Sequence, residues 1–171
     1  MAARRRLGLP VQKQLLTIYL SDHLGGATGA VQRLSQMTSQ YTDLSVHAEL
    51  VTLTSQIKQD RAVLLDIIER VRVRPQRHKV VAGRFAETLG RLKMNGRVWS
   101  RSPLTPLVEI EAIQAGVAAK LSLWQTLDAH ADTLGLDVDD LADLQDRARS
   151  QLLVLEQCHA GLAPGAFADG S

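Results

Sequence analysis

The stretch "VHAELVTLTSQIKQDRAVLLDIIERV", residues 46–71, decides the fold class. Its apolar residues recur by alternating steps of three and four, which is the period of one face of an α-helix. We expect this helix to begin near Ser45 and to end before Arg74, because a residue that precedes proline disfavours the α conformation. The apolar face carries one polar residue, Asp60, among Val46, Leu50, Leu53, Ile57, Leu64, Ile67 and Val71.

The same spacing recurs in three other segments, at residues 11–40, from Ser102 to about 132, and about 137–159. Their predicted core positions are Leu16, Leu20, His23, Ala27, Ala30, Leu34, Met37 and Tyr41, then Ile110, Ile113, Val117, Leu121, Trp124, Leu127 and Ala131, then Leu141, Leu144, Ala148, Leu152, Leu155, His159 and Leu162. A further helix is expected over residues 79–98. Apolar faces joined by short turns favour helices packed at shallow angles, so the sequence predicts an all-α fold, an antiparallel bundle of four to five helices.

Length and composition indicate the domain organisation and the cellular compartment of this bundle. A chain of 171 residues is long enough for one domain with a real core, and we expect a flexible basic N-terminus over 1–10, a bundle over 11–160 and a disordered tail over 161–171. The single cysteine, Cys158, excludes an internal disulfide and fits a reducing compartment. No apolar segment follows the basic start or reaches the length of a membrane span, so the prediction is a cytoplasmic protein without a membrane span.

Charge is strongly segregated along the chain. Residues 70–101 hold ten basic side chains and one acidic side chain, whereas the segment after residue 101 is mainly acidic. The basic residues include Arg77, Arg84, Arg91, Lys93, Arg97 and Arg101, which form two stripes on the expected third helix. Such a surface fits an anion, a nucleic acid, or the acidic half of this protein in the same or another copy. Few aromatic residues accompany it, which weakens the case for nucleic acid.

The stretch "YLSDHLGGATGAVQRL", residues 19–34, contains the glycines that most resemble a ligand-binding loop. A phosphate-binding loop needs a preceding strand and a closing Lys-Ser/Thr pair, and neither is present. Gly25 and Gly29 are four residues apart on the helix face opposite the core, which predicts a packing notch or a kink. A break in the helix that binds a ligand is the alternative.

His23 and Asp60 are polar residues on two apolar faces that a turn at 41–46 brings together. If the two helices are antiparallel, the side chains lie about 6 Å apart along the bundle axis, since each residue rises about 1.5 Å. We expect a buried hydrogen-bonded pair, because a buried polar group needs a partner. The alternative is a site that binds a metal or handles protons.

A metal centre is the second interpretation of the buried polar residues. Its candidate ligands are Asp22, His23, Glu49, Asp60 and Glu109, with iron or another divalent metal as the cofactor. Di-iron bundles draw on two Glu-x-x-His motifs, and this chain has one, at residues 156–159. A bundle without metal or other cofactor is therefore the leading expectation.

The stretches "IYLSDHLGGATGAVQRL", "LTSQIKQDRAVLLDIIERVRVRP" and "AGRFAETLGRLKMNGRVWSRSPLTPLVEIEAIQAGVAAKLSLW" resemble a group of small actinobacterial helical proteins that lies loosely beside the ferritin-like bundles. The resemblance covers roughly residues 14–160 and implies a ferritin-like fold, but it implies no activity. Neither a serine-nucleophile motif nor a dinucleotide-binding motif is present. The leading functional hypothesis is a non-enzymatic bundle that acts by association with a protein partner or with itself; the alternatives are the metal-binding bundle and the anion or nucleic-acid binder.

Overall fold

The computed structural model describes residues 11–74 and 102–168, and every regular element in these ranges is helical. The long helices are α1 (Lys13–Gln40), α2 (His47–Arg70), α4 (Leu104–Ala129) and α6 (Val138–Leu162). Two short elements accompany them, α5 (Ala131–Leu134) and the 3₁₀ turn η1 (Ala163–Gly165). The prediction of an all-helical bundle is confirmed. The expected helix over 79–98, which carries Arg77, Arg84, Arg91, Lys93, Arg97 and Arg101 on or beside it, lies outside the described residues.

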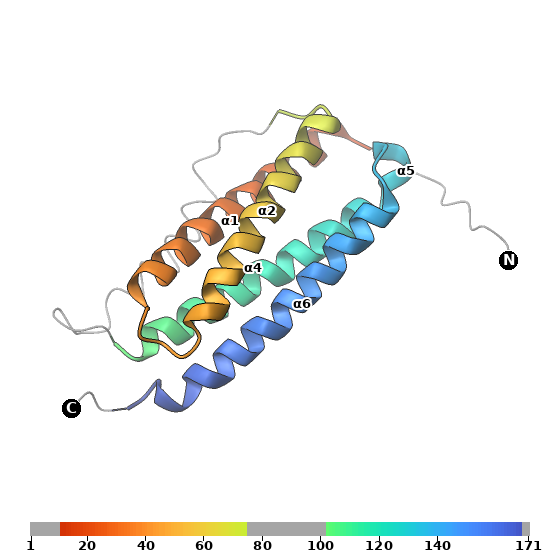
Figure 1. Cartoon of the computed structure of the whole chain (residues 1–171). Helices are drawn as coiled ribbons and strands as arrows, with labels where there is room; N and C mark the ends of the chain where they lie inside the picture. The colour runs from red at the N-terminus through yellow and green to blue at the C-terminus, as the bar shows by residue number, and fades with distance from the viewer. Residues whose placement is uncertain (1–10, 75–101, 169–171) are drawn as a thin grey trace, which may run out of the picture.

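The four long helices pack side by side around one core (Figure 1). α1 pairs closely with α2, and α4 pairs closely with α6, whereas contacts between α1 and α4 and between α2 and α6 are sparser. Hydrogen bonds join Tyr19 to Thr126 and Arg33 to Glu109 across the α1–α4 boundary. α2 ends at one end of the bundle and α4 starts at the opposite end (Figure 1).

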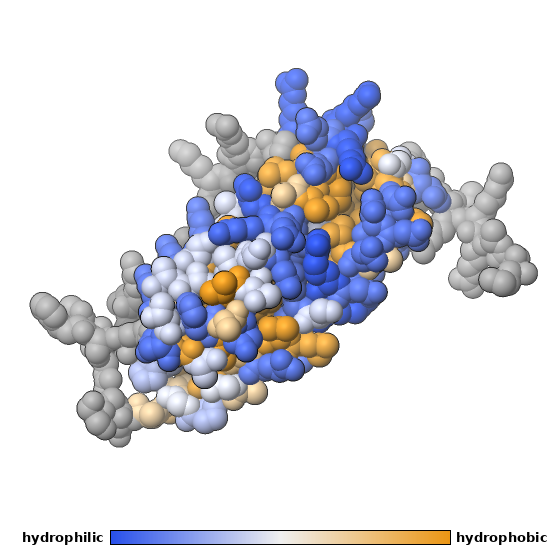
Figure 2. Space-filling view, in the orientation of Figure 1, coloured by the Kyte–Doolittle hydropathy of each residue, from blue (hydrophilic) through white to orange (hydrophobic). Residues whose placement is uncertain are grey.

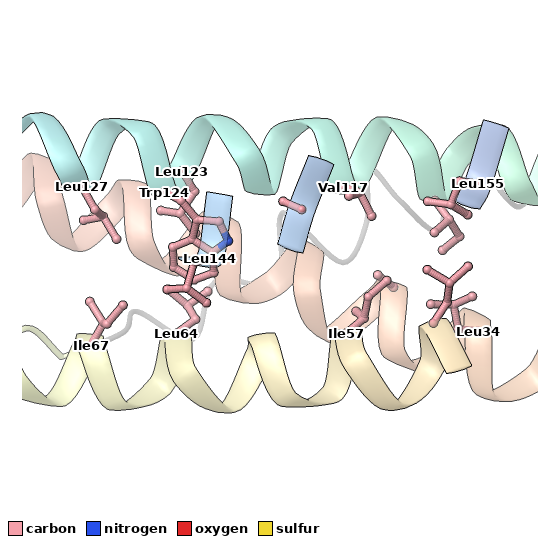
Figure 3. Packing of buried hydrophobic residues seen from close by; sticks show 14 of the residues in the cluster. Leu34, Ile57, Leu64, Ile67, Val117, Leu123, Trp124, Leu127, Leu144 and Leu155 are labelled. Carbon is pink, nitrogen blue, oxygen red and sulfur yellow. The ribbon is translucent and has the colours of Figure 1, made fainter. Parts of the chain in front are cut away.

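The core consists mainly of the apolar faces that the sequence predicts, although His23, Leu121 and His159 are only partly buried and Leu123 is buried in addition. From α1 and α2 it takes residues that include Leu20, Leu34, Leu50, Leu53 and Leu64, each at most 2 % exposed. Trp124 and Leu123 of α4 lie opposite Leu64 of α2 (Figure 3). Trp124 and Leu123 are each 1 % exposed, so the bundle interior is closed at this level by one large ring and its aliphatic neighbours.

The turn before α6 follows the expected capping chemistry. Asp137 Oδ1 accepts hydrogen bonds from the backbone N–H groups of Asp139 at 2.8 Å and Asp140 at 3.4 Å, which satisfies donors that a helix start leaves free. Gly135 ends α5 with φ of 65°, a left-handed conformation that glycine adopts at little cost. These two residues separate α4 and α5 from α6.

The helical part of the chain extends past the expected boundary at residue 160. α6 continues through Leu162, η1 follows directly, and Ala166 is 4 % exposed. The first part of the segment expected as a loose tail is therefore packed against the bundle. Over the described ranges, no helix combines the length and the apolar character that crossing a membrane requires.

Candidate functional site

A cavity of about 210 Å³ lies between α1, α2 and α4 at mid-bundle. Small residues face each other across it, with Gly26, Ala27 and Ala30 on α1 opposite Gly116 and Ala119 on α4. Small side chains usually let two helices approach closely, but here they leave space. The rest of the wall is formed by Asp22, His23, Ile57, Asp60, Arg61, Leu64, Val117, Lys120, Leu123 and Trp124.

Asp60 lies at the wall of this cavity and is 2 % exposed. Its Oδ2 accepts hydrogen bonds from the ammonium of Lys120 and, at 3.1 Å, from the amide of Gln151. Arg147 Nη2 lies 2.6 Å from Oδ1, an ion pair that lacks the alignment of a hydrogen bond. Lys120 also donates to Gln151 Oε1. We call these four residues the Asp60 cluster; it joins α2, α4 and α6.

Lys120 is buried because its position on α4 faces the interior. Only 12 % of its side chain is exposed, and burial lowers the pKa of its ammonium, while the carboxylate of Asp60 opposes that shift. A buried charge needs a partner of opposite sign and further hydrogen bonds, and Asp60 and Gln151 supply both. The cluster therefore holds Lys120 as an ammonium within the core.

His23 and Asp60 do not form the hydrogen-bonded pair that the sequence predicts. Among the described residues no hydrogen bond joins His23 to Asp60, because Asp60 is engaged by the cations of α4 and α6. The His23 ring instead packs edge-on against Tyr19, with centroids 4.6 Å apart. Burial lowers the pKa of His23, and the nearby Asp22 partly offsets this. Asp22 itself is exposed at the edge of the cavity.

Trp124, which lines the cavity, carries a buried hydrogen-bond donor that has no partner. Its indole Nε1 is buried and has no hydrogen-bond partner, and the whole residue is only 1 % exposed. The indole nitrogen lies on the side of the ring toward Val117 and Ile57 (Figure 3), and both of these residues also line the cavity. A buried donor without a partner is uncommon in native proteins; this atom has almost no accessible surface, so a molecule in the cavity reaches it only if the wall rearranges.

Glu109 and Glu49 lie away from the cavity wall. Glu109 is 3 % exposed; it accepts a hydrogen bond from Arg33 at 2.9 Å and from the Tyr41 hydroxyl at 2.7 Å. Glu49 is exposed in the first turn of α2. The structure thus brings Asp22, His23 and Asp60 to one cavity and leaves the two glutamates elsewhere.

The donor set does not fit a metal centre. Within residues 11–74 and 102–168, no group of three or more His, Cys, Asp or Glu side chains lies close enough to hold a metal ion. The place beside Asp60 that a cation needs is taken by Lys120 and Arg147. A metal ion at Asp60 requires both side chains to move away.

The predicted glycine notch is wrong at Gly29. A Cβ built there meets no atom within 4 Å, so among residues 11–74 and 102–168 no helix packs closely against this glycine. α1 runs unbroken through the glycines from Lys13 to Gln40. The glycine that matters is Gly26, whose missing side chain contributes to the cavity.

Sequence reasoning missed Lys120, Trp124, Arg147 and Gln151 as parts of the site. One signal was present for Lys120: it is the only charged residue between Glu111 and Asp128, in an otherwise apolar or uncharged stretch. A lone charge in such a helix needs a buried partner. Comparisons of the chain with protein-family models, curated proteins and solved structures give no match.

Proposed function

We propose that this protein is a non-enzymatic helical bundle that works by binding, and that its ligand is a small molecule held in the α1–α2–α4 cavity. The observation that carries the proposal is a preformed space of about 210 Å³ between α1, α2 and α4, whose lining includes Lys120 and Trp124. Protein interiors are close-packed, and their buried donors are nearly always paired. A ligand in this space restores close packing.

The state of the polar residues supports binding without catalysis. Asp60 is held by Lys120, Arg147 and Gln151, so it has no free position from which to act as a general base. Cys158 is buried, and burial raises the pKa of its thiol to about 11. Such a thiol is almost entirely protonated at neutral pH and is a poor nucleophile.

For the fold, we propose an antiparallel bundle with ferritin-like topology. Residue numbers rise along α1 as they fall along α4 in the pairs Tyr19–Thr126 and Arg33–Glu109. Residue numbers also rise along α4 as they fall along α6, in the pairs Glu111–His159 and Lys120–Gln151. Two helix pairs joined by one long crossover are typical of ferritin-like bundles, and these contacts support that order.

The proposed function is tested by filling the cavity. In wild-type protein we expect small aromatic probes such as toluene and benzyl alcohol to shift the NMR signal of the Trp124 indole N–H, with Trp99→Phe used to assign that signal. Ala27→Leu places a larger side chain in the cavity and should abolish the shift. Ala115→Leu is the matched control, because Ala115 is exposed on α4 and does not line the cavity. Probes that leave the wild-type signal unmoved contradict the proposal.

Association with another protein is a second proposal, favoured by a groove of about 280 Å³ between α2 and α6. Its lining includes the apolar Val63, Ile67, Leu141 and Leu144, and its charged residues are four acids, Asp66, Asp137, Asp140 and Asp143, and two bases, Arg70 and Arg147. Figure 2 shows apolar surface between the upper parts of α2 and α6, flanked by hydrophilic side chains. The occupant that we propose is a second copy, because each chain carries both this acidic groove and a basic segment.

Sedimentation of the full chain at low and high salt tests this self-association. We expect a dimer at low salt that salt weakens, and we expect Asp140→Lys with Asp143→Lys to weaken it at low salt. A monomer under every condition, or a dimer that ignores both changes, contradicts the second proposal.

A further inference from the structure

Building on the proposed function, we infer that the ligand of the α1–α2–α4 cavity is an uncharged, flat, apolar molecule, one aromatic ring with a short alkyl substituent. Three features of the cavity carry this inference: the balance of the charged groups on its wall, its shape and its volume.

The charged groups that line the cavity balance one another. Asp22 and Asp60 are acids, and Arg61 and Lys120 are bases. Asp22 is exposed to solvent at the edge of the cavity. His23 adds no charge that changes this balance at neutral pH, because burial lowers its pKa below the ordinary 6.5. The wall therefore carries no excess charge of either sign for an ionic ligand to neutralise.

The two bases of the wall already have protein partners. Lys120 donates hydrogen bonds to Asp60 and to Gln151, and Arg61 donates from Nε to the hydroxyl of Thr28 at 3.0 Å. A charged head group inside the cavity loses its water, while the buried charge beside it is compensated by its own ion pair. Burying an ion on these terms is costly, so the cavity selects an uncharged molecule.

The shape of the cavity favours a flat molecule. Gly26, Ala27 and Ala30 of α1 lie opposite Gly116 and Ala119 of α4, so these two stretches of wall carry no side chain larger than a methyl group. A planar ring between them contacts both stretches over its two faces, and dispersion attraction grows with the number of such contacts. A thicker, non-planar ring of the same mass makes fewer of them.

The volume limits the ligand to about one ring. An apolar cavity of about 150 Å³ accommodates a benzene molecule, and this cavity has about 210 Å³, which leaves room for a short alkyl group. Large apolar side chains complete the wall, namely Ile57, Leu64, Val117, Leu123 and Trp124. The ligand is therefore held by burial of apolar surface and by contact with an aromatic neighbour, without need of a hydrogen bond.

The test titrates the full chain at pH 7 with four probes of similar size: ethylbenzene, ethylcyclohexane, benzoate and benzylamine. Chemical shifts of the backbone amide groups of α1 and α4 report binding. We expect ethylbenzene to bind at least about tenfold more tightly than either ion, because only the ions lose charge hydration. We also expect it to bind about threefold more tightly than ethylcyclohexane, the effect of an aromatic contact.

The outcomes separate this inference from the proposed function. Benzoate or benzylamine that binds as tightly as ethylbenzene overturns the uncharged ligand, and ethylcyclohexane that binds as tightly overturns the planar ring. Either result leaves the proposed function standing. Binding of none of the four probes overturns the proposed function itself.

Two glycine substitutions on α1 test the planar fit. Gly26→Ala adds a methyl group to the cavity wall and should weaken ethylbenzene binding about tenfold, since overfilling a packed space is costly. Gly29→Ala is the matched control, because Gly29 does not line the cavity and a Cβ there meets no atom within 4 Å. It should leave the affinity unchanged. Ethylbenzene that binds equally to the two variants overturns the planar fit.

Discussion

Two carboxylates are buried in the described part of the chain, Asp60 and Glu109, and their surroundings differ. Asp60 lies in the middle of α2, beside the cavity, and its charged partners come from α4 and α6. Glu109 lies near the start of α4, and its partners Arg33 and Tyr41 come from α1 and the residue that ends it. The exposed fractions of the two residues, 2 % and 3 %, are almost equal.

The difference is in the access of their cations to water. The Lys120 side chain is 12 % exposed, whereas the side chains of Arg33 and of Arg147, the second cation at Asp60, are 24 % and 34 % exposed. If the negative charge is removed, Arg33 can turn toward solvent, but Lys120 stays enclosed beside a second cation, Arg147. Equal burial of two carboxylates therefore does not imply equal importance, because the cost of losing one depends on what its partners can do next.

The largest expected effect follows from neutralising Asp60. Asp60→Asn leaves the enclosed ammonium of Lys120 without a counter-charge, and we expect a loss of about 3–5 kcal/mol in the free energy of unfolding. Urea denaturation measures it. Adding Lys120→Met to Asp60→Asn should recover part of the loss; a double variant no more stable than the single one contradicts this account of the cluster.

A smaller loss is expected at Glu109. Glu109→Gln keeps the shape and the hydrogen bond from Tyr41 but removes the charge that faces Arg33, so we expect about 1–2 kcal/mol. Tyr41→Phe, which deletes one buried hydroxyl, should cost about 1 kcal/mol. The comparison fails if Glu109→Gln destabilises the protein more than Asp60→Asn in the same denaturation series.

A gain in stability is expected from a substitution that fills the cavity beside Asp60. Ala27→Leu fills space next to the cluster and should add about 1 kcal/mol to the free energy of unfolding, while it abolishes the binding of aromatic probes. Thermal unfolding and probe titration check the two effects separately. A destabilised variant shows that the space is too narrow for a leucine side chain, and retained probe binding contradicts the position of the site.

The smallest expected effect is a pH dependence of the free energy of unfolding that comes from His23, which lines the same cavity. Burial lowers the folded-state pKa of His23 below its ordinary 6.5, so the unfolded chain takes up a proton first as pH falls. Its contribution to stability is present above pH 6.5 and is lost as pH falls from there through the folded-state pKa. Between about pH 7.5 and pH 5, the wild type should lose more stability than His23→Gln. Equal losses contradict a neutral, buried His23.

The sequence was sufficient for the helices and their buried faces, because apolar spacing depends on each helix alone. It also singled out Asp60 as the polar residue of an apolar face. The sequence could not identify the partners of Asp60, because these depend on which helices become neighbours. His23 was expected there because α1 and α2 are adjacent in sequence, but the cations come from α4 and α6.

Glu109 and the cavity illustrate the same limit. Glu109 was considered as a metal ligand, but its partners are Arg33 and Tyr41, which lie 76 and 68 residues away in sequence. Gly26, Ala27, Gly116 and Ala119 are ordinary small residues in a sequence, and only their juxtaposition makes a cavity. Pairing between distant segments, rather than local pattern, determines the site.

An anomalous difference map from a xenon-pressurised crystal tests the central claim most directly, because it reports gas in the cavity and metal at Asp60 together. We predict a xenon peak between Gly26, Gly116 and Trp124, no peak at the Asp60 carboxylate, and Lys120 in place beside it. A metal peak at Asp60 with Lys120 turned away, or no xenon at all between α1 and α4, would contradict the account.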